Sequence, residues 1–267
     1  MNESLVSSSL PWVWRDGWCR GQVKASLSTK LKVATWNVWF DRFEREERTR
    51  ATIDALGASG ADVIALQEVT PSFLLQFLST DWVRQGWVSH GFPDSVEPYA
   101  TVLWGRRPAR VFIEDLPSEK GRQLCAAEIG SGVVATAHLE SQRDNHAKRG
   151  EQLIAIQTTL SRYSWAVWLG DFNFDPSWPH ESGRIDAGYV DAWEKKGEGA
   201  GATVDTARNG MALAHKGAPR DVRYDRVYAR NAKVRRTELV GTEAIAVGVW
   251  CSDHFGVVAE LDVPKSA

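Results

Sequence analysis

One pattern constrains this chain more than any other. A short apolar run, typical of a buried strand, borders a polar side chain of a type that holds metals or phosphates. The pattern occurs at five places, which carry Asn37, Glu68, His138, Asp171 with Asn173, and Asp253 with His254. Each residue alone has an ordinary alternative, as a turn residue, a helix cap or a structural histidine. Because side chains at strand ends converge where a rigid scaffold meets solvent, the five places together favour one site for metal-assisted phosphoryl chemistry.

Alternating or apolar runs predict strands, and residues with helical periodicity predict helices. The expected strands cover residues 31–36, 62–66, 99–104, 110–114, 124–129, 133–138, 165–169, 223–229, 233–240 and 256–261. The expected helices cover residues 44–56, a segment that begins at Pro71, and residues 144–160. Residues 195–218 are rich in glycine, alanine and polar side chains and are expected to form a long loop.

The length of 267 residues is long for one average domain and short for two, and the chain shows no repeat or linker. We therefore expect a single domain over residues 29–267. An irregular leader, residues 1–28, precedes it, and the tryptophans of this leader are expected to dock on the domain.

Charge and cysteine usage exclude several classes of protein. The net charge is −2 and the pI is about 6.3, so binding of nucleic acid has to be local, in a cleft or at an end. Cys19, Cys125 and Cys251 lie far apart without CxxC spacing, which indicates neither a zinc site nor a disulfide framework and favours a reducing, cytoplasmic setting. We expect no membrane span and no signal peptide, because the chain has neither an 18-residue apolar run nor a basic, then apolar N-terminus.

Five short motifs resemble, in type and order, those of the endonuclease/exonuclease/phosphatase superfamily. They are Thr35-Trp36-Asn37, Leu66-Gln67-Glu68-Val69, His138-Leu139-Glu140-Ser141, Gly170-Asp171-Phe172-Asn173 and Ser252-Asp253-His254. The resemblance spans residues 31–263 and implies an α/β fold in which a two-layer β-sandwich is flanked by α-helices. A lone GDxN or SDH motif is weak, but the ordered set is specific.

Within the superfamily the chain is most similar to the 5′-tyrosyl-DNA phosphodiesterases. The similarity includes Arg143 and Arg149 after the HLES motif, and the segments 189–194 and 223–226. Three positions depart from that family. Trp39 stands where it has an aspartate, Asp175 where it has an arginine, and Val204 where it has a tryptophan. The first change affects the outer metal shell, and the other two affect recognition of the substrate.

The resemblance implies a phosphodiesterase that depends on Mg²⁺, for which Mn²⁺ may substitute. Mg²⁺ prefers oxygen ligands and keeps several waters, so one or two carboxylates suffice. Glu68 is the expected metal ligand, with Asp253 behind it. Asp171 is expected to orient the attacking water, and Asn37 and Asn173 to hold water and phosphate.

The remaining candidates act on the phosphate and the substrate. His254 and His138 are expected to donate to the non-bridging oxygens of the phosphate. Asp225 resembles the family aspartate that pairs with the histidine of the SDH motif and favours its charged form. Ser141 and Arg143 are expected to bind the substrate.

These residues favour an enzyme that processes nucleic-acid ends, with a DNA or RNA end as its partner and no obligate protein partner. One alternative is an enzyme of the same fold that acts on RNA ends, including cyclic phosphates or poly(A), or on a sugar or lipid phosphate. A second alternative is an inactive binding module. A basic run between residues 220 and 236 is either a solvated face or a track for a phosphate backbone.

Overall fold

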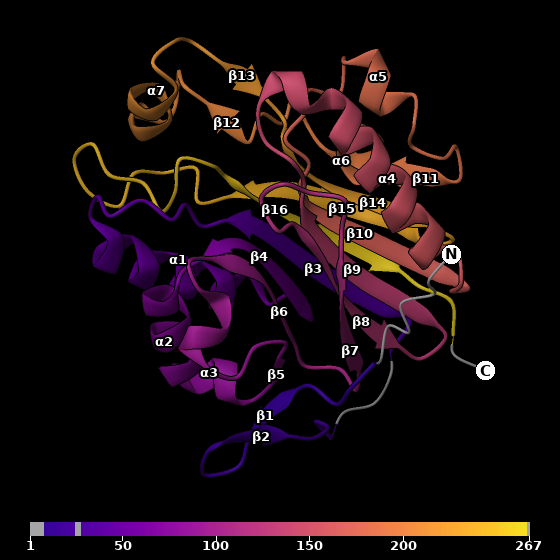
Figure 1. The fold of residues 1–267 in the computed structure, drawn as a ribbon. Helices are drawn as coiled ribbons and strands as arrows, with labels where there is room; N and C mark the ends of the chain where they lie inside the picture. Colours follow the sequence, from indigo (N-terminus) through magenta and orange to yellow (C-terminus); the bar gives the residue numbers. More distant parts are fainter. Residues whose placement is uncertain (1–7, 25–27, 266–267) are drawn as a thin grey trace.

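The computed structural model describes residues 8–24 and 28–265, and two β-sheets packed face to face form its centre (Figure 1). The larger sheet has the order β15-β16-β3-β4-β6-β5-β1-β2, and the second has the order β11-β14-β10-β9-β8-β7. The strands of the larger sheet are β1 (Trp12–Trp14), β2 (Trp18–Arg20), β3 (Lys30–Asn37), β4 (Val63–Val69), β5 (Trp87–Val88), β6 (Ala100–Gly105), β15 (Lys233–Val240) and β16 (Gly256–Asp262). Those of the second sheet are β7 (Arg110–Asp115), β8 (Gln123–Ile129), β9 (Gly132–His138), β10 (Trp165–Asp171), β11 (Tyr189–Asp191) and β14 (Asp225–Arg230).

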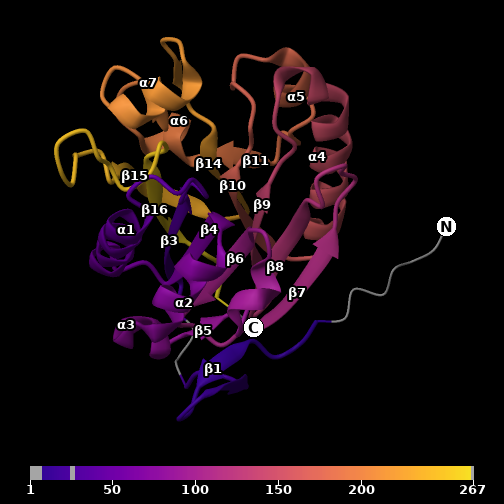
Figure 2. The ribbon, with the colours of Figure 1, turned by 60° about the vertical axis from the view of Figure 1, so that its left-hand side comes forward.

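Helices cover the outer faces of both sheets (Figures 1 and 2). The α-helices are α1 (Arg45–Ser59), α2 (Pro71–Ser79), α3 (Asp81–Arg84), α4 (His146–Leu160), α5 (Pro179–Ser182), α6 (Ala192–Lys196) and α7 (Gly210–Lys216). Two short 3₁₀ helices, η1 (Pro93–Val96) and η2 (Arg143–Asn145), and a small ribbon of β12 (Val204–Asp205) and β13 (Asp221–Val222) complete the fold. Helices α1 to α3 lie against the larger sheet and α4 against the second, so the predicted sandwich with flanking helices is confirmed.

Alternation along the central strands decides which side chains meet between the sheets. On β3, Leu31 and Val33 belong to the core between the sheets, whereas Ala34 and Trp36 belong to the core under α1 and α2. Successive side chains of a strand point to opposite faces, so Asn37 continues the row of Leu31 and Val33. On β10, Asp171 likewise continues the row of side chains that faces the core between the sheets, and Asp225 does so on β14. The site is therefore an extension of the inter-sheet core.

The directions of the strands bring Asn37, Asp171 and Asp225 to one end of the sandwich. β3 is parallel to β4, and β9 is parallel to β10, so the carboxyl ends of each pair lie together. β14 runs antiparallel to β10, and its first residue, Asp225, pairs with Asp171. Gln67 links the sheets near this end, because its Nε2 donates to Thr136 Oγ1 at 3.0 Å.

Two predicted segments differ from the structure. The irregular conformation expected for residues 1–28 is wrong for β1 and β2, which pair with each other and extend the larger sheet through β5; residues 1–7 and 25–27 lie outside the described part. The long loop expected for residues 195–218 contains α7. Asn209 caps this helix, because its side chain accepts hydrogen bonds from the N–H groups of Met211 and Ala212. In the described residues, no helix is both long and apolar enough to cross a lipid bilayer.

Candidate active site

Glu68 reaches the site because β4 is irregular at this residue. The pairing of β4 with β6 shifts register between Leu66 and Val69, and Glu68 has a φ of 60°. Regular alternation would turn Glu68 with Leu66 toward the helices, but the irregularity turns it toward Asn37 instead. A non-glycine residue in this left-handed region is strained, which is common at functional sites.

Asn37 joins the carboxylates of the two sheets. Its Nδ2 donates to Glu68 Oε1 at 3.1 Å and to Asp171 Oδ2 at 3.0 Å. The backbone N–H of Trp39 donates to Asn37 Oδ1 at 3.0 Å, which fixes the orientation of the amide. The backbone N–H of Phe40 donates to the other oxygen of Glu68 at 3.0 Å. Asn37 therefore holds two acidic side chains close together without adding a charge.

Asp171 is a buried carboxylate surrounded by donors. Besides Asn37, it accepts a hydrogen bond from the backbone N–H of Asn173 at 2.9 Å, and His138 Nε2 lies 3.4 Å away. Although burial opposes its ionisation, His138, His254 and these hydrogen bonds hold the pKa of Asp171 below its usual range. Asp171 is therefore ionised at neutral pH.

His138 is a neutral donor in this arrangement. Arg122 Nη1 lies 3.0 Å from His138 Nδ1, and because arginine only donates, Nδ1 is the acceptor and Nε2 carries the hydrogen. Burial and the charge of Arg122 lower the pKa of His138 to about 3. The N–H at Nε2 faces Asp171 and Glu68.

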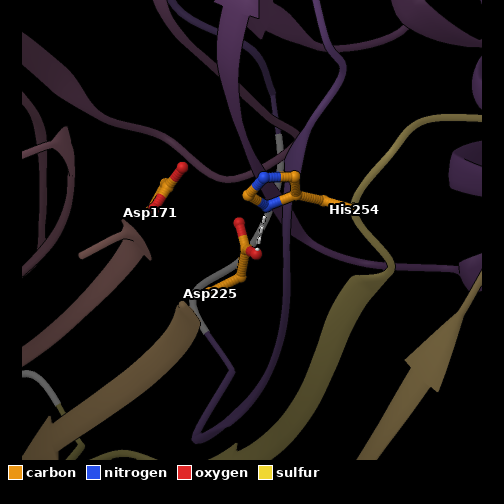
Figure 3. Close-up of side chains that lie close together, drawn as sticks. All are labelled: Asp171, Asp225 and His254. Carbon is orange, nitrogen blue, oxygen red and sulfur yellow. Dashed lines mark hydrogen bonds and ion pairs between the residues drawn. The ribbon is translucent and has the colours of Figure 1, made fainter. Parts of the chain in front are cut away.

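His254 is the cationic counterpart of His138. Its Nδ1 lies 2.7 Å from Asp225 Oδ2. Figure 3 shows this pair, with Asp171 close to it. Burial alone would lower the pKa of His254, but the carboxylates of Asp225 and Asp253 outweigh it and raise the pKa to about 10. The predicted pairing of Asp225 with His254 is present in the geometry, and Nε2 of the imidazolium remains to donate.

Asp253 is engaged by two residues that the sequence analysis did not assign. His215 Nδ1 lies 2.7 Å from Asp253 Oδ2, and Lys216 Nζ lies 3.2 Å from the same oxygen. Although burial opposes ionisation, His254, His215 and Lys216 hold the pKa of Asp253 well below its usual range. Both partners lie at the end of α7, and the Asn209 cap before α7 and Gly217 after it were the available signals for this helix.

One group of described residues is close enough together to hold a metal ion, and a second set beside it, around Glu68, is suited to one by its chemistry. Ligand atoms of Asp171, Asp225 and His254 lie within 4.8 Å of one another. An imidazolium bonded to a carboxylate is not a metal ligand, so this group does not suit a cation. Glu68 does suit one. Burial and the nearby charge of Asp253 raise its pKa, so a bound cation would favour its ionised form. In the described part of the chain no lysine or arginine pairs with it. Its oxygens and those of Asn37 and Asp171 are of the type that Mg²⁺ prefers.

A cleft of about 550 Å³ opens beside the buried site. Its lining includes Ser141, Arg143, Asn173, Trp178, Lys216 and Arg220. The cleft thus brings together both predicted substrate-binding residues and Asn173, and its described lining residues include three cations and no carboxylate. It is suited to an anionic ligand that reaches the buried carboxylates past Asn173.

The other arginines of the basic run have partners within the protein. Arg223 pairs with Asp191 and Glu194, and the buried Arg226 donates to the carbonyl of Phe174. Arg230 donates to two backbone carbonyls at 2.8 Å. These residues therefore stabilise the fold, and of the run only Arg220 lines the cleft.

Comparison with known proteins agrees with this geometry. The profile of the endonuclease/exonuclease/phosphatase family matches residues 34–254. Tyrosyl-DNA phosphodiesterase 2 from Danio rerio is 27% identical over 266 residues, which cover 91% of this chain and 69% of that protein. The Homo sapiens protein of the same name is 28% identical over 261 residues, which cover 87% and 68%.

Solved structures share the fold. The D. rerio protein complexed with a single-strand DNA product matches with a TM-score of 0.77 at 24% identity, covering 88% of this chain and 100% of that chain. An endonuclease/exonuclease/phosphatase family protein from Bacteroides thetaiotaomicron matches with a TM-score of 0.67 at 16% identity, covering 89% and 96%.

Proposed function

This chain belongs to the endonuclease/exonuclease/phosphatase family, and we propose that it is a metal-dependent phosphodiesterase that hydrolyses a phosphate ester at a DNA end, of the 5′-tyrosyl-DNA type. The observation that carries the proposal is the cationic cleft lined by Asn173, whose backbone N–H donates to the buried Asp171, which in turn accepts from Asn37. The relatives named tyrosyl-DNA phosphodiesterase 2 support the choice of substrate.

The reaction uses each side chain according to its charge. Ionised Asp171 accepts a proton from the water that attacks phosphorus, while the bond from phosphorus to the leaving oxygen breaks. Cationic His254 and neutral His138 donate to the non-bridging oxygens, where negative charge grows in the transition state. Asn37 and Asn173 hold the water and the phosphate in line. Glu68 would hold a divalent cation, with Mg²⁺ the expected ion and Mn²⁺ its substitute, and when bound this ion would add to the neutralisation of charge.

The cleft explains how a protein with a net negative charge would bind the end of a polyanion. Arg143, Lys216 and Arg220 contribute local positive charge, and Arg143 lies 5.4 Å from the ring of Trp178, an aromatic residue of the cleft lining. Val204 is fully buried. Asp175 accepts a hydrogen bond from the N–H of Ser177 and belongs to a turn. Recognition of the substrate would therefore depend on Trp178 and the three cations.

A panel of oligonucleotides tests the proposal. The substrates are single-stranded DNA with a 5′-phosphotyrosyl end, the same with a 3′-phosphotyrosyl end, RNA with a 5′-phosphotyrosyl or 2′,3′-cyclic phosphate end, and a circular strand. We expect the highest kcat/KM on the 5′-phosphotyrosyl DNA with Mg²⁺, and no cleavage of the circle. The Asp171→Asn variant serves as the inactive control.

Preference for an RNA end would favour the alternative substrate class. Equal cleavage of linear and circular strands would contradict action at ends. Absence of turnover on all of them, despite metal binding, would favour the inactive module.

A further inference from the structure

A second opening leads to the buried site from the larger sheet. It is a groove of about 730 Å³, hereafter the Phe40 groove, formed by the loop after β3, the starts of α1 and α2, and the segment before β6. The cationic cleft, in contrast, is lined by residues that follow β9 and β10 of the second sheet and by residues around α7 and β13. The two openings therefore belong to different parts of the fold.

The Phe40 groove adjoins both Glu68 and His138. Phe40, which lines the groove, donates its backbone N–H to Glu68 Oε2 at 3.0 Å. A smaller hollow of about 340 Å³ has His138 in its lining and shares Tyr99 with the groove. A ligand in the groove would therefore lie beside the expected metal ligand and beside a donor to the phosphate.

Phe40 presents an exposed aromatic ring on a fixed loop. The residue is 44% exposed, and its ring stacks on that of Tyr99, with the centroids 5.0 Å apart and the planes 7° from parallel. Two arginines of α1 hold the loop, because Arg45 Nε and Arg48 Nη2 donate to the carbonyl of Asp41 at 3.0 and 2.7 Å. An apolar side chain held in this way loses little conformational freedom on binding, which favours a role as a contact for a ligand.

The two openings differ in charge. The described lining of the cationic cleft includes three cations and no carboxylate. In the Phe40 groove, Asp41 and Glu97 balance Arg42 and Arg45. A phosphate backbone binds where positive charge accumulates, so the groove is poorly suited to DNA. An aromatic side chain among balanced charges is instead typical of a surface that binds polypeptide.

The chemistry of a phosphodiester requires two paths out of the site. The two ester groups diverge from phosphorus, and the leaving oxygen lies opposite the attacking water in an in-line displacement. If the DNA occupies the cationic cleft, the tyrosine and the polypeptide around it have to leave the site along another path. The Phe40 groove supplies such a path, because it adjoins the site from the larger sheet.

We propose that the Phe40 groove binds the polypeptide that carries the leaving tyrosine, with the Phe40 ring as a specificity-determining contact. The DNA strand would occupy the cationic cleft, so that phosphorus lies between two surfaces of different charge. This inference rests on the proposed function, since it assumes a tyrosyl leaving group. Under it, the length of the peptide on the tyrosine affects turnover, and Phe40 mediates that effect.

The first test compares two substrates that differ only in the leaving group. Both are the same single-stranded DNA with a 5′-phosphotyrosyl end, one bearing tyrosine amide and the other a decapeptide with the tyrosine at its centre. The wild-type chain should show about tenfold higher kcat/KM on the decapeptide substrate, the effect of one well-packed aromatic contact. Phe40→Ala should bring the two values within about twofold, and Phe40→Tyr, which keeps the ring, should retain most of the advantage.

Phe43→Ala is the matched control. Phe43 lies on the same loop and is 48% exposed, but it is not among the described residues that line the groove. Its contacts with Asp41 and Arg48 are made by its backbone, so the ratio between the two substrates should stay at the wild-type value.

Two kinetic results would overturn the proposal. One is equal kcat/KM on both substrates in the wild type, an outcome that does not depend on the folding of any variant. The other is an equally large effect of Phe40→Ala on a substrate whose leaving group is an oligonucleotide, which would assign the groove to a nucleic-acid strand.

Binding without turnover separates this proposal from the proposed function. The probes are N-acetyl-phosphotyrosine amide and a decapeptide with phosphotyrosine at its centre, and calorimetry measures their affinity for the Asp171→Asn variant. The decapeptide should bind about tenfold more tightly, and addition of Phe40→Ala should remove the difference. Failure of the tyrosyl-DNA panel with this difference intact would count against the proposed reaction and not against the groove. Equal affinity of the two probes would count against the groove, whatever the panel shows.

Discussion

Glu68 and Asp253 are both shielded carboxylates at the same end of the sandwich, yet their pKa values are shifted in opposite directions. Burial and the nearby charge of Asp253 raise the pKa of Glu68, and its hydrogen bonds from an amide and a backbone N–H offset this only in part. The pKa of Asp253 is held low, because its partners are His254, His215 and Lys216. Burial takes water from both carboxylates, so the charged groups beside each one decide the direction of its shift. Under the proposed function, the Glu68 side would be the half of the site that binds a cation from solution, whereas side chains of the chain itself neutralise Asp253.

The largest effect should come from breaking the Glu68 side. Glu68→Gln keeps the shape of the side chain but removes the charge, so affinity for Mn²⁺ and turnover should fall together. The loss in kcat/KM should be about a thousandfold, or about 4 kcal/mol, because a metal ion contributes several kcal/mol to the transition state. Calorimetry with Mn²⁺ and steady-state kinetics measure both quantities. Unchanged metal affinity would remove Glu68 from the metal site.

On the other side, His254→Ala should lower kcat about a hundredfold with little change in KM. Its imidazolium gains most when charge accumulates on the phosphate oxygens, and loss of one such donor costs about 3 kcal/mol. Affinity for Mn²⁺ should stay near the wild-type value, which separates this variant from Glu68→Gln. Near-normal turnover would leave His254 as a structural residue before β16.

The smallest change at neutral pH is expected for Asp225→Asn. In the wild type the pKa of His254 is raised to about 10, so activity that needs the imidazolium falls only as pH rises through that value. Without the Asp225 charge the pKa of His254 decreases, and the fall in activity moves to lower pH. A pH–rate profile of both proteins measures this shift. Identical alkaline limbs would mean that Asp225 does not set the charge of His254.

Alternation and motif order made much of the fold and site predictable. The strands that carry Asn37, His138 and Asp171 are short runs of buried residues whose spacing is local, and the geometry brings these side chains together. Such patterns depend on neighbouring residues alone, which is why the predicted bounds of β3, β9 and β10 lie close to the observed ones.

The elements that the sequence patterns do not predict depend on contacts between distant parts of the chain. β1 and β2 are three residues long and are strands only because they pair with each other and β5. α7 has seven residues, which are too few for a periodic pattern, so the sequence predicts a loop at Lys216. Its contact with Asp253 spans 37 residues, and nothing in the SDH motif indicates which side chain will meet its aspartate. The partners of a motif carboxylate therefore come from a segment without a motif.

The left-handed backbone of Glu68 has a consequence for how such chains change over generations. At φ 60° a glutamate is a poor choice for folding, and asparagine suits that conformation better, by about 1 kcal/mol. Under the proposed function, selection for stability would favour replacement of Glu68, and selection for turnover would retain it. A descendant released from catalysis would be expected to drift to asparagine or glycine here before its core changed. The residue at position 68 would then distinguish an active enzyme from an inactive protein of the same fold.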